Sequence, residues 1–179
     1  MNRRQLHRLQ EESRALQHLA CAGLAECRAF ASARTASGFI WAYDGLPGLV
    51  QTGQGLLVWT SWGVLVALPR RYPIDPPSVY VSAAGCEGRP FHPNILPAPP
   101  YLLCYGQHQP LRLLDGLARR VARIIRLGRG AVMTDERNSL HGAACQPVRR
   151  LLQEAVAPLA TDSSLPDWCR AFGQSPEER

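Results

Sequence analysis

The first apolar residues of the chain recur at the spacing of one helix face. They are Leu6, Leu9, Leu16, Leu19, Leu24 and Cys27, with charged or polar residues between them. This pattern is typical of an amphipathic α-helix, so we predict a helix from about Arg4 to Cys27. Its exposed face carries the basic side chains of Arg3, Arg4, Arg8 and Arg14.

Between Gly38 and Ala83 the pattern changes to short apolar runs that are rich in β-branched and aromatic residues. The runs are Phe39 to Tyr43, Gly55 to Thr60, Gly63 to Leu68 and Val79 to Ser82. Such runs predict strands, and their order predicts a four-stranded antiparallel meander. The short connection at Ser61-Trp62-Gly63 predicts that the two middle runs form a hairpin.

Proline and glycine crowd the segment from Ala83 to Gly106, which predicts a long ordered loop because proline cannot continue a helix or a central strand. Loops of this length are often functional. Amphipathic patterns then predict two helices, at about Leu111 to Leu127 and about Arg137 to Leu159. Together these elements predict an α+β fold with helices packed on one face of an antiparallel sheet.

Length and composition limit the class of protein. The 179 residues, 46% of them apolar, predict one domain over residues 1–160 and a polar tail over 161–179. The N-terminal residues are charged and no apolar run is long enough to cross a bilayer, so we expect a cytoplasmic protein without a membrane segment. The six cysteines include no CxxC pair and no Cys–His cluster at zinc-ligand spacing, so no metal or other cofactor is expected.

All twenty basic residues are arginine, and the chain contains no lysine. The formal net charge of +6 permits contact with nucleic acid or with an acidic protein surface and does not choose between them. Two explanations for the missing lysines stay open at this point. One is a GC-rich genome that favours arginine codons, and the other is selection against lysine as a nucleophile.

Three motifs follow one another in a fixed order. The first is Tyr72-Pro73-Ile74-Asp75-Pro76-Pro77-Ser78-Val79-Tyr80, the second is His92-Pro93-Asn94-Ile95, and the third is Cys104 after two leucines. Their order resembles that of the ubiquitin-conjugating enzymes, which carry a YPxxPPxVxF signature, an HPN(I) motif and a catalytic cysteine followed by an amphipathic helix. The resemblance covers roughly Leu6 to Leu159 and implies a ubiquitin-conjugating-enzyme-like fold. Extra prolines before Cys104 and the absence of a Trp after it place the chain with divergent bacterial members.

The resemblance implies an enzyme that accepts a ubiquitin-like modifier from an activating enzyme as a thioester on Cys104 and transfers it to an amine of a target protein. Bacterial members tend to be encoded beside an activating enzyme, a ubiquitin-like protein and a deubiquitinase-like metalloprotease, often in antiphage defence operons. By position in the family, Arg3, Arg4 and Arg8 of the first helix are candidates to meet the activating enzyme. The loops that contain Ile74 and Pro110 correspond to the ligase-binding loops.

The residue types suit this chemistry. Exchange between thioesters needs a thiolate that is both a good nucleophile and a good leaving group, which cysteine supplies. Asn94 is the candidate amide donor to the oxyanion, and it could also only fix the loop by bonding local backbone. His92 is read as a structural residue, as in the family, in preference to a base for Cys104. Asp135 could orient an incoming amine, although a simple surface acid explains it better.

Three other readings remain. A catalytically silent binding module of the same fold lacks the cysteine that this chain has. A cysteine hydrolase would use Cys104 with His92 or His141, but no acid stands at a recognisable spacing. A basic nucleic-acid-binding domain would need aromatic residues among the arginines of the helix from Leu111 to Leu127, and that helix has none. We therefore expect no nucleic-acid partner.

Overall fold

A computed structural model describes residues 3–17, 24–31, 37–106, 114–128, 130–133 and 135–154. Its helices are α1 (Arg3–Gln17), α2 (Leu114–Ile125) and α3 (Gly142–Glu154), and its strands are β1 (Leu24–Ala31), β2 (Ser37–Tyr43), β3 (Gly48–Thr52), β4 (Gly55–Trp59), β5 (Trp62–Leu68), β6 (Ser78–Ala83) and β7 (Arg89–Pro90). The strands form two antiparallel sheets, in the orders β1-β2-β5-β6 and β4-β3-β7. The fold is α+β, as predicted. None of the described helices is long and apolar enough to cross a membrane.

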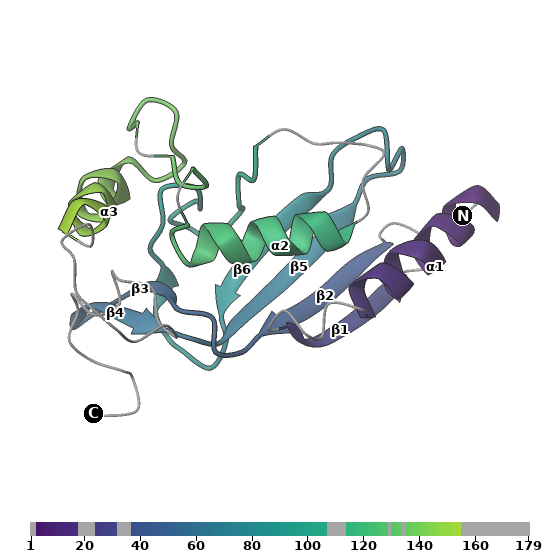
Figure 1. Cartoon of the computed structure of the whole chain (residues 1–179), viewed down its shortest axis with the longest axis horizontal. Coiled ribbons are helices and arrows are strands. Elements are labelled where there is room, and N and C mark those ends of the chain that lie inside the picture. The colour runs from purple at the N-terminus through teal and green to yellow at the C-terminus, as the bar shows by residue number, and fades with distance from the viewer. Residues whose placement is uncertain are drawn as a thin grey trace.

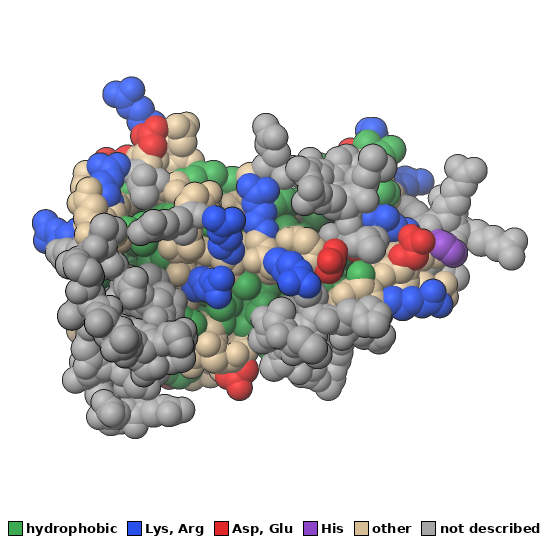
Figure 2. Space-filling view, viewed as in Figure 1, with side chains coloured by type: hydrophobic (Ala, Val, Ile, Leu, Met, Phe, Trp, Pro, Cys, Tyr) green, Lys and Arg blue, Asp and Glu red, His purple; other side chains and the backbone are tan. Residues whose placement is uncertain are grey.

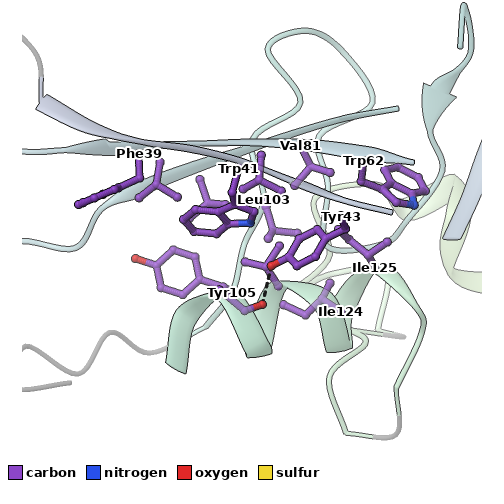
Figure 3. Close-up of a cluster of buried hydrophobic side chains, with 14 of the residues drawn as sticks. Phe39, Trp41, Tyr43, Trp62, Val81, Leu103, Tyr105, Ile124 and Ile125 are labelled. Atoms are coloured by element: carbon purple, nitrogen blue, oxygen red, sulfur yellow. Dashed lines mark hydrogen bonds between the residues drawn. The ribbon is translucent and has the colours of Figure 1, made fainter. Parts of the chain in front are cut away.

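The main sheet is apolar on one face because its strands alternate. Every second residue of β2, β5 and β6 is buried, namely Phe39, Trp41 and Tyr43, then Trp62, Val64, Val66 and Leu68, then Val79, Val81 and Ala83. Side chains two apart in a strand share a face, so these residues form one surface, and α2 lies across it (Figure 1). The Tyr43 hydroxyl donates a 2.7 Å hydrogen bond to the Ala118 carbonyl, which fixes α2 over the sheet (Figure 3).

The prediction of one helix from Arg4 to Cys27 is wrong at its C-terminal end. The described helix α1 covers Arg3–Gln17, and Leu24 to Cys27, which the prediction assigns to the last turns of the helix, belong to β1. In β1, Cys27 stands opposite Trp41 and Ala29 opposite Phe39. The apolar residues at Leu24 and Cys27 fit a helical repeat equally well, so pairing with β2 decides the structure of this segment. Residues 18–23 lie outside the described part of the chain.

The predicted meander is also wrong in its middle. The strand predicted at Gly55 to Thr60 exists as β4, but it pairs with β3 in the second sheet, and β5 pairs with β2 and β6. The hairpin predicted at Ser61-Trp62-Gly63 is therefore absent, and the short strand β3 was missed. The true hairpin turns at Gly53-Gln54, where the Thr52 hydroxyl donates to the Gly55 carbonyl and accepts from the Gln54 N–H, both at 3.2 Å.

Both later helices are present with shorter limits. α2 buries Leu114, Val121, Ile124 and Ile125 of the predicted stripe, together with Ala118. Its end is a left-handed cap: Leu127 has φ 56°, and the N–H of Gly128 donates a 2.8 Å hydrogen bond to the Arg123 carbonyl.

The third helix begins at Gly142 rather than at Arg137. The preceding residues form a turn, in which the N–H groups of Leu140 and His141 both donate to the Pro93 carbonyl, at 2.9 and 3.1 Å. Val148 and Leu151 of α3 pack with Leu49 and Val58 of the second sheet to form a smaller apolar cluster. Residues 111–113 and 155–159 of the predicted helices, like the predicted tail 161–179, lie outside the described residues.

A buried carboxylate joins α1 to the rest of the domain. Glu12 is 0% exposed, and its Oε1 accepts a 2.5 Å hydrogen bond from the Tyr72 hydroxyl. Its Oε2 accepts a 2.6 Å hydrogen bond from the N–H of Leu114, the first residue of α2, and Arg8 Nε lies 2.8 Å from Oε1. A negative charge at a helix N-terminus is favourable, so Glu12 caps α2 from a neighbouring helix. We call these four residues the Glu12 junction.

Candidate functional site

The loop that carries Cys104 is fixed to the edge of the main sheet. Leu103 N–H donates to the Val79 carbonyl at 2.8 Å, and Leu103 also forms a β-bridge with Ile95. Leu103 itself is 3% exposed and belongs to the main core. The next residue, Cys104, is partly exposed and its thiol is free of any disulfide. An anchored leucine therefore positions a partly exposed cysteine that has no disulfide.

Asn94 connects three pieces of backbone around this cysteine. Its Nδ2 donates to the carbonyls of Cys104 and Ala131, at 3.1 and 3.3 Å, and its Oδ1 accepts from the N–H of Met133 at 2.9 Å. Its own carbonyl accepts the N–H of Cys104 at 2.8 Å. Asn94 is 2% exposed, and its amide makes all the hydrogen bonds that its two N–H groups allow. These hydrogen bonds tie Asn94 to backbone that lies 10, 37 and 39 residues away in the chain.

His92 lies beneath the loop. Its Nδ1 accepts the Asn94 N–H at 3.0 Å, so the ring proton belongs on Nε2. Burial lowers the pKa of His92 to about 3, with the Ile124 carbonyl opposing this shift and His141 adding to it. The imidazole is therefore neutral near pH 7, and its accepting nitrogen is already used. This geometry fits the structural role given to His92 and leaves no free acceptor to take a proton from Cys104.

The surroundings of Cys104 include an aromatic and a basic side chain. The Tyr105 hydroxyl donates to the Pro77 carbonyl at 2.8 Å, and burial, with a contribution from Cys104, raises the pKa of Tyr105 to about 12. Gly106 has φ 83°, and a Cβ added to it would lie 2.8 Å from a guanidinium nitrogen of Arg120. Arg120 of α2 therefore covers the backbone two residues beyond the candidate nucleophile.

The remaining predicted residues lie in different settings. Asp135 is exposed, and its carboxylate accepts from the Arg137 N–H at 3.1 Å and the Asn138 amide at 2.8 Å, which closes a turn. His141 is buried and packs edge-to-face on Phe91 at 5.1 Å between ring centroids. Burial, and to a smaller extent Arg89, lowers the pKa of His141.

The candidate partner residues are only partly described. Arg8 belongs to the Glu12 junction, and Ile74 is 64% exposed at the surface. The side chains of Arg3 and Arg4, and residue Pro110, lie outside the described set. Nothing in the structure links Arg8 or Ile74 to a partner.

Sequence reasoning missed the segment that completes the Asn94 contacts. Ala131 and Met133 are 37 and 39 residues away from Asn94 in the chain, and they follow the left-handed end of α2. The signal available in the sequence was only Gly128 and Gly130, which mark a turn after the helix. Among the described residues no group of three or more His, Cys, Asp or Glu side chains could hold a metal ion.

No known protein-family model matches this chain, and a comparison with curated proteins finds no match. The motifs and the geometry of the loop are therefore the features that bear on function.

Proposed function

We propose that this protein is a ubiquitin-conjugating-type enzyme that carries a ubiquitin-like modifier as a thioester on Cys104. The observation that supports it most is the reciprocal bonding of Asn94 and Cys104. The Cys104 N–H donates to the Asn94 carbonyl and the Asn94 amide donates to the Cys104 carbonyl, while Cys104 as a residue is partly exposed. A cysteine that was only a core residue would be buried, as Cys145 is with 0% exposure.

The order of elements supports the finer assignment of the fold. A ubiquitin-conjugating-enzyme-like domain has an N-terminal helix, four antiparallel strands, an active-site loop and then a helix. Here α1, the sheet β1-β2-β5-β6, the loop of Asn94 and Cys104, and α2 follow in that order. The hairpin β3–β4 is inserted between the second and third strands of that sheet.

The first chemical step is an exchange of thioesters. The Cys104 thiolate attacks the carbonyl carbon of the thioester on the activating enzyme, a new carbon–sulfur bond forms, and the donor cysteine leaves as a thiolate. In the second step a target amine attacks the carbonyl carbon of the Cys104 thioester, and the carbonyl oxygen gains negative charge. The carbon–sulfur bond then breaks, Cys104 leaves as a thiolate, and the nitrogen loses a proton to solvent as the amide forms. Asn94 is the candidate amide donor to that oxyanion. Both N–H groups of its Nδ2 are already bonded to carbonyls, so one of these bonds must be given up, and the bond to Ala131 is the longer at 3.3 Å.

The partners follow from this proposal. They are an activating enzyme met through α1, a ubiquitin-like modifier, a target protein, and a ligase at the loops of Ile74 and Pro110. The setting we propose is a bacterial conjugation pathway in antiphage defence.

The test is a charging reaction with the activating enzyme and modifier encoded nearby, plus ATP. We expect a reducible adduct that Cys104→Ala abolishes and that Cys104→Ser traps as an oxyester. Cys86→Ala is the matched control, because Cys86 is also free and partly exposed but lies between β6 and β7, before the HPNI motif. Charging of the Cys104→Ala protein would contradict the proposal. Noncovalent binding of the modifier without charging would indicate the silent binding module.

A further inference from the structure

Strand β4 forms an edge of the second sheet that lacks the usual protection against pairing with a further strand. Among the described strands it pairs only with β3, and its sequence Gly-Leu-Leu-Val-Trp contains no charged residue and no proline. The other described edges are protected. β1 contains Glu26, Arg28 and a shift of register, β6 is bridged by Leu102, and β7 consists of Arg89–Pro90. β4 is therefore the described edge that can accept another strand.

The open backbone groups of this edge belong to Leu56 and Val58. Along an antiparallel pair, the residues of every second pair bond each other, and those between them point outward. Leu49 stands opposite Val58, and its carbonyl accepts the N–H of Phe91 on the far side of β3, at 2.9 Å. Leu49 and Val58 therefore form an outward-pointing pair, and by the same alternation Leu56 points away from β3. In the described part of the chain no hydrogen bond reaches these groups of β4.

A surface pocket adjoins the same edge on the side of α3. It has a volume of about 460 Å³ and is lined by Leu56 of β4 and by α3, whose contribution includes the apolar residues Pro147 and Leu151 and the basic residues Arg149 and Arg150. None of the described lining residues comes from β3, so the pocket opens beyond the edge of the sheet, and none of them is acidic. β4 and α3 lie at the same end of the molecule (Figure 1), where basic side chains are at the surface (Figure 2).

We infer that the β4 edge and this pocket dock an extended segment of a partner protein that presents apolar and acidic side chains in turn on one face. The segment adds a strand beside β4 and bonds the backbone groups of Leu56 and Val58. Neighbouring strands lie about 4.8 Å apart and side chains two apart share a face, so alternate side chains of the segment reach the pocket. An apolar one contacts Leu56 and Leu151, and a carboxylate pairs with Arg150, which is exposed and makes no ion pair within the described part of the chain.

A second copy of this chain fits the edge less well than an acidic segment does. Antiparallel pairing of two β4 edges puts the two-fold axis perpendicular to the sheet, so the same face of each copy lies on the same side. The arginines of the two α3 helices, Arg149 and Arg150 in each copy, would then lie on one side of the joined sheet. Like charges brought together across an interface weaken binding.

The test measures the binding of three fluorescein-labelled octapeptides to the full chain by fluorescence anisotropy. The first peptide is Thr-Leu-Thr-Glu-Thr-Leu-Thr-Glu, the second has lysine in place of glutamate, and the third is the first with every backbone amide N-methylated. We expect the glutamate peptide to bind about tenfold more tightly than the lysine peptide, because one is attracted and the other repelled by Arg150. The N-methylated peptide keeps the charges but cannot donate to the strand, so its binding should weaken at least about tenfold.

Charge reversal locates the basic contact. Arg150→Glu should reverse the preference, so that the lysine peptide binds more tightly than the glutamate peptide. Arg119→Glu is the matched control and should keep the wild-type preference. Arg119 is also an exposed arginine of a helix, and it stands four residues from Asp115 as Arg150 stands four residues from Glu154. Unchanged melting temperatures confirm that both variants are folded.

Hydrogen exchange of the wild-type protein locates the strand contact without any substitution. The glutamate peptide should slow the exchange of the Leu56 and Val58 N–H groups, because they become bonded to the added strand. The inference goes beyond the proposed function and does not depend on it, since Cys104→Ala should bind the three peptides as wild type does.

Four outcomes would overturn the inference. They are the absence of peptide binding, equal binding of the N-methylated peptide, protection confined to other strands, and equal effects of Arg150→Glu and Arg119→Glu. Sedimentation of the wild type as a dimer that the glutamate peptide does not dissociate would identify a second copy as the occupant instead.

Discussion

Glu12 and Asn94 are both buried polar side chains that join separate segments, and they do so with different chemistry. Glu12 is charged and its contacts with Tyr72, Leu114 and Arg8 span 2.5 to 2.8 Å. Asn94 is neutral, and the hydrogen bonds of its amide span 2.9 to 3.3 Å. Charge-assisted bonds are shorter and roughly twice as strong as neutral ones.

This difference indicates which of the two side chains, Glu12 or Asn94, can take part in a reaction. The Glu12 junction has no partly exposed nucleophile in its set of contacts, and losing any contact would leave a charge buried. Asn94 bonds the backbone of a partly exposed cysteine, and it can exchange one carbonyl acceptor for another without exposing a charge. Complete burial with satisfied hydrogen bonds therefore does not by itself indicate function. A role in chemistry is indicated only where a reactive group, such as Cys104, lies next to the buried side chain.

The largest effect is expected at the Glu12 junction. Glu12→Ala should lower the free energy of unfolding by about 3–5 kcal/mol, because it leaves Arg8 and the N–H of Leu114 without their buried partner. Urea denaturation measures this. Glu11→Ala is the matched control, since the Glu11 side chain is 44% exposed and lies 3.6 Å from His7, and the change should alter stability by less than about 0.5 kcal/mol. If the two variants were equally stable, Glu12 would not stabilise the fold, and its contrast with Asn94 would fail.

The second effect concerns Asn94 and the transfer step. Asn94→Ala should leave charging of Cys104 largely intact and slow discharge to an amine by about 100- to 1000-fold, because the oxyanion forms in that step. Asn138→Ala is the matched control, as the Asn138 amide bonds Asp135 at the surface. Single-turnover assays compare the rates. If Asn94→Ala discharges as fast as wild type, Asn94 is only a structural residue. Asn94 and Glu12 would then differ only in how strongly they hold the fold together.

A smaller effect depends on pH. The pKa of His92 is about 3 in the folded protein, against an ordinary value of 6.5, because the ring is buried beneath Asn94. Below pH 6.5 the unfolded chain therefore binds a proton that the folded protein does not, so stability falls as pH drops through this window and is constant above it. Between pH 7 and pH 5.5 wild type should lose roughly 1 kcal/mol more than His92→Gln. Equal losses would show that the ring is accessible to protons.

The smallest effect tests the missing lysines. Arg120→Lys keeps the charge beside Gly106 but introduces a primary amine close to the thioester, where proximity gives a large effective concentration. We expect a minor, reductant-resistant adduct to accumulate slowly on that lysine. Arg71→Lys, in the loop that precedes β6, should form none. Gels with and without reductant, followed by peptide mapping, measure this. Abundant stable adducts on side chains of the wild-type protein, which contains no lysine, would leave codon bias as the explanation.

The sequence predicts the parts of this molecule that depend on local pattern. The stripes of α2 and α3 repeat at helical spacing, and the HPNI motif and Cys104 are recognisable without a structure. β1 was missed because its apolar residues also fit the end of a helix, and its pairing with β2 is a long-range contact. β3 was missed because it is short and lies between glycines.

The prediction of the buried polar contacts, including those of the candidate site, was incomplete for the same physical reason. Glu12 reads as one more polar residue on a helix, and only the approach of Tyr72 and Leu114 makes it a buried cap. Ala131 and Met133 contribute backbone groups to Asn94, and backbone groups carry no sequence signature. Sequence patterns therefore do not predict the contacts that such residues make across the fold.

The hydrogen bond between Glu12 and Leu114 also orders events during synthesis. The two residues are 102 positions apart, and at typical elongation rates Leu114 is made roughly 5–20 s after Glu12. Throughout that interval the Glu12 carboxylate lacks the Leu114 N–H, and α1 lacks its contact with α2. The helix that leaves the ribosome first is therefore among the last to dock, and a nascent chain halted before residue 114 should expose α1 to proteases that the finished domain resists.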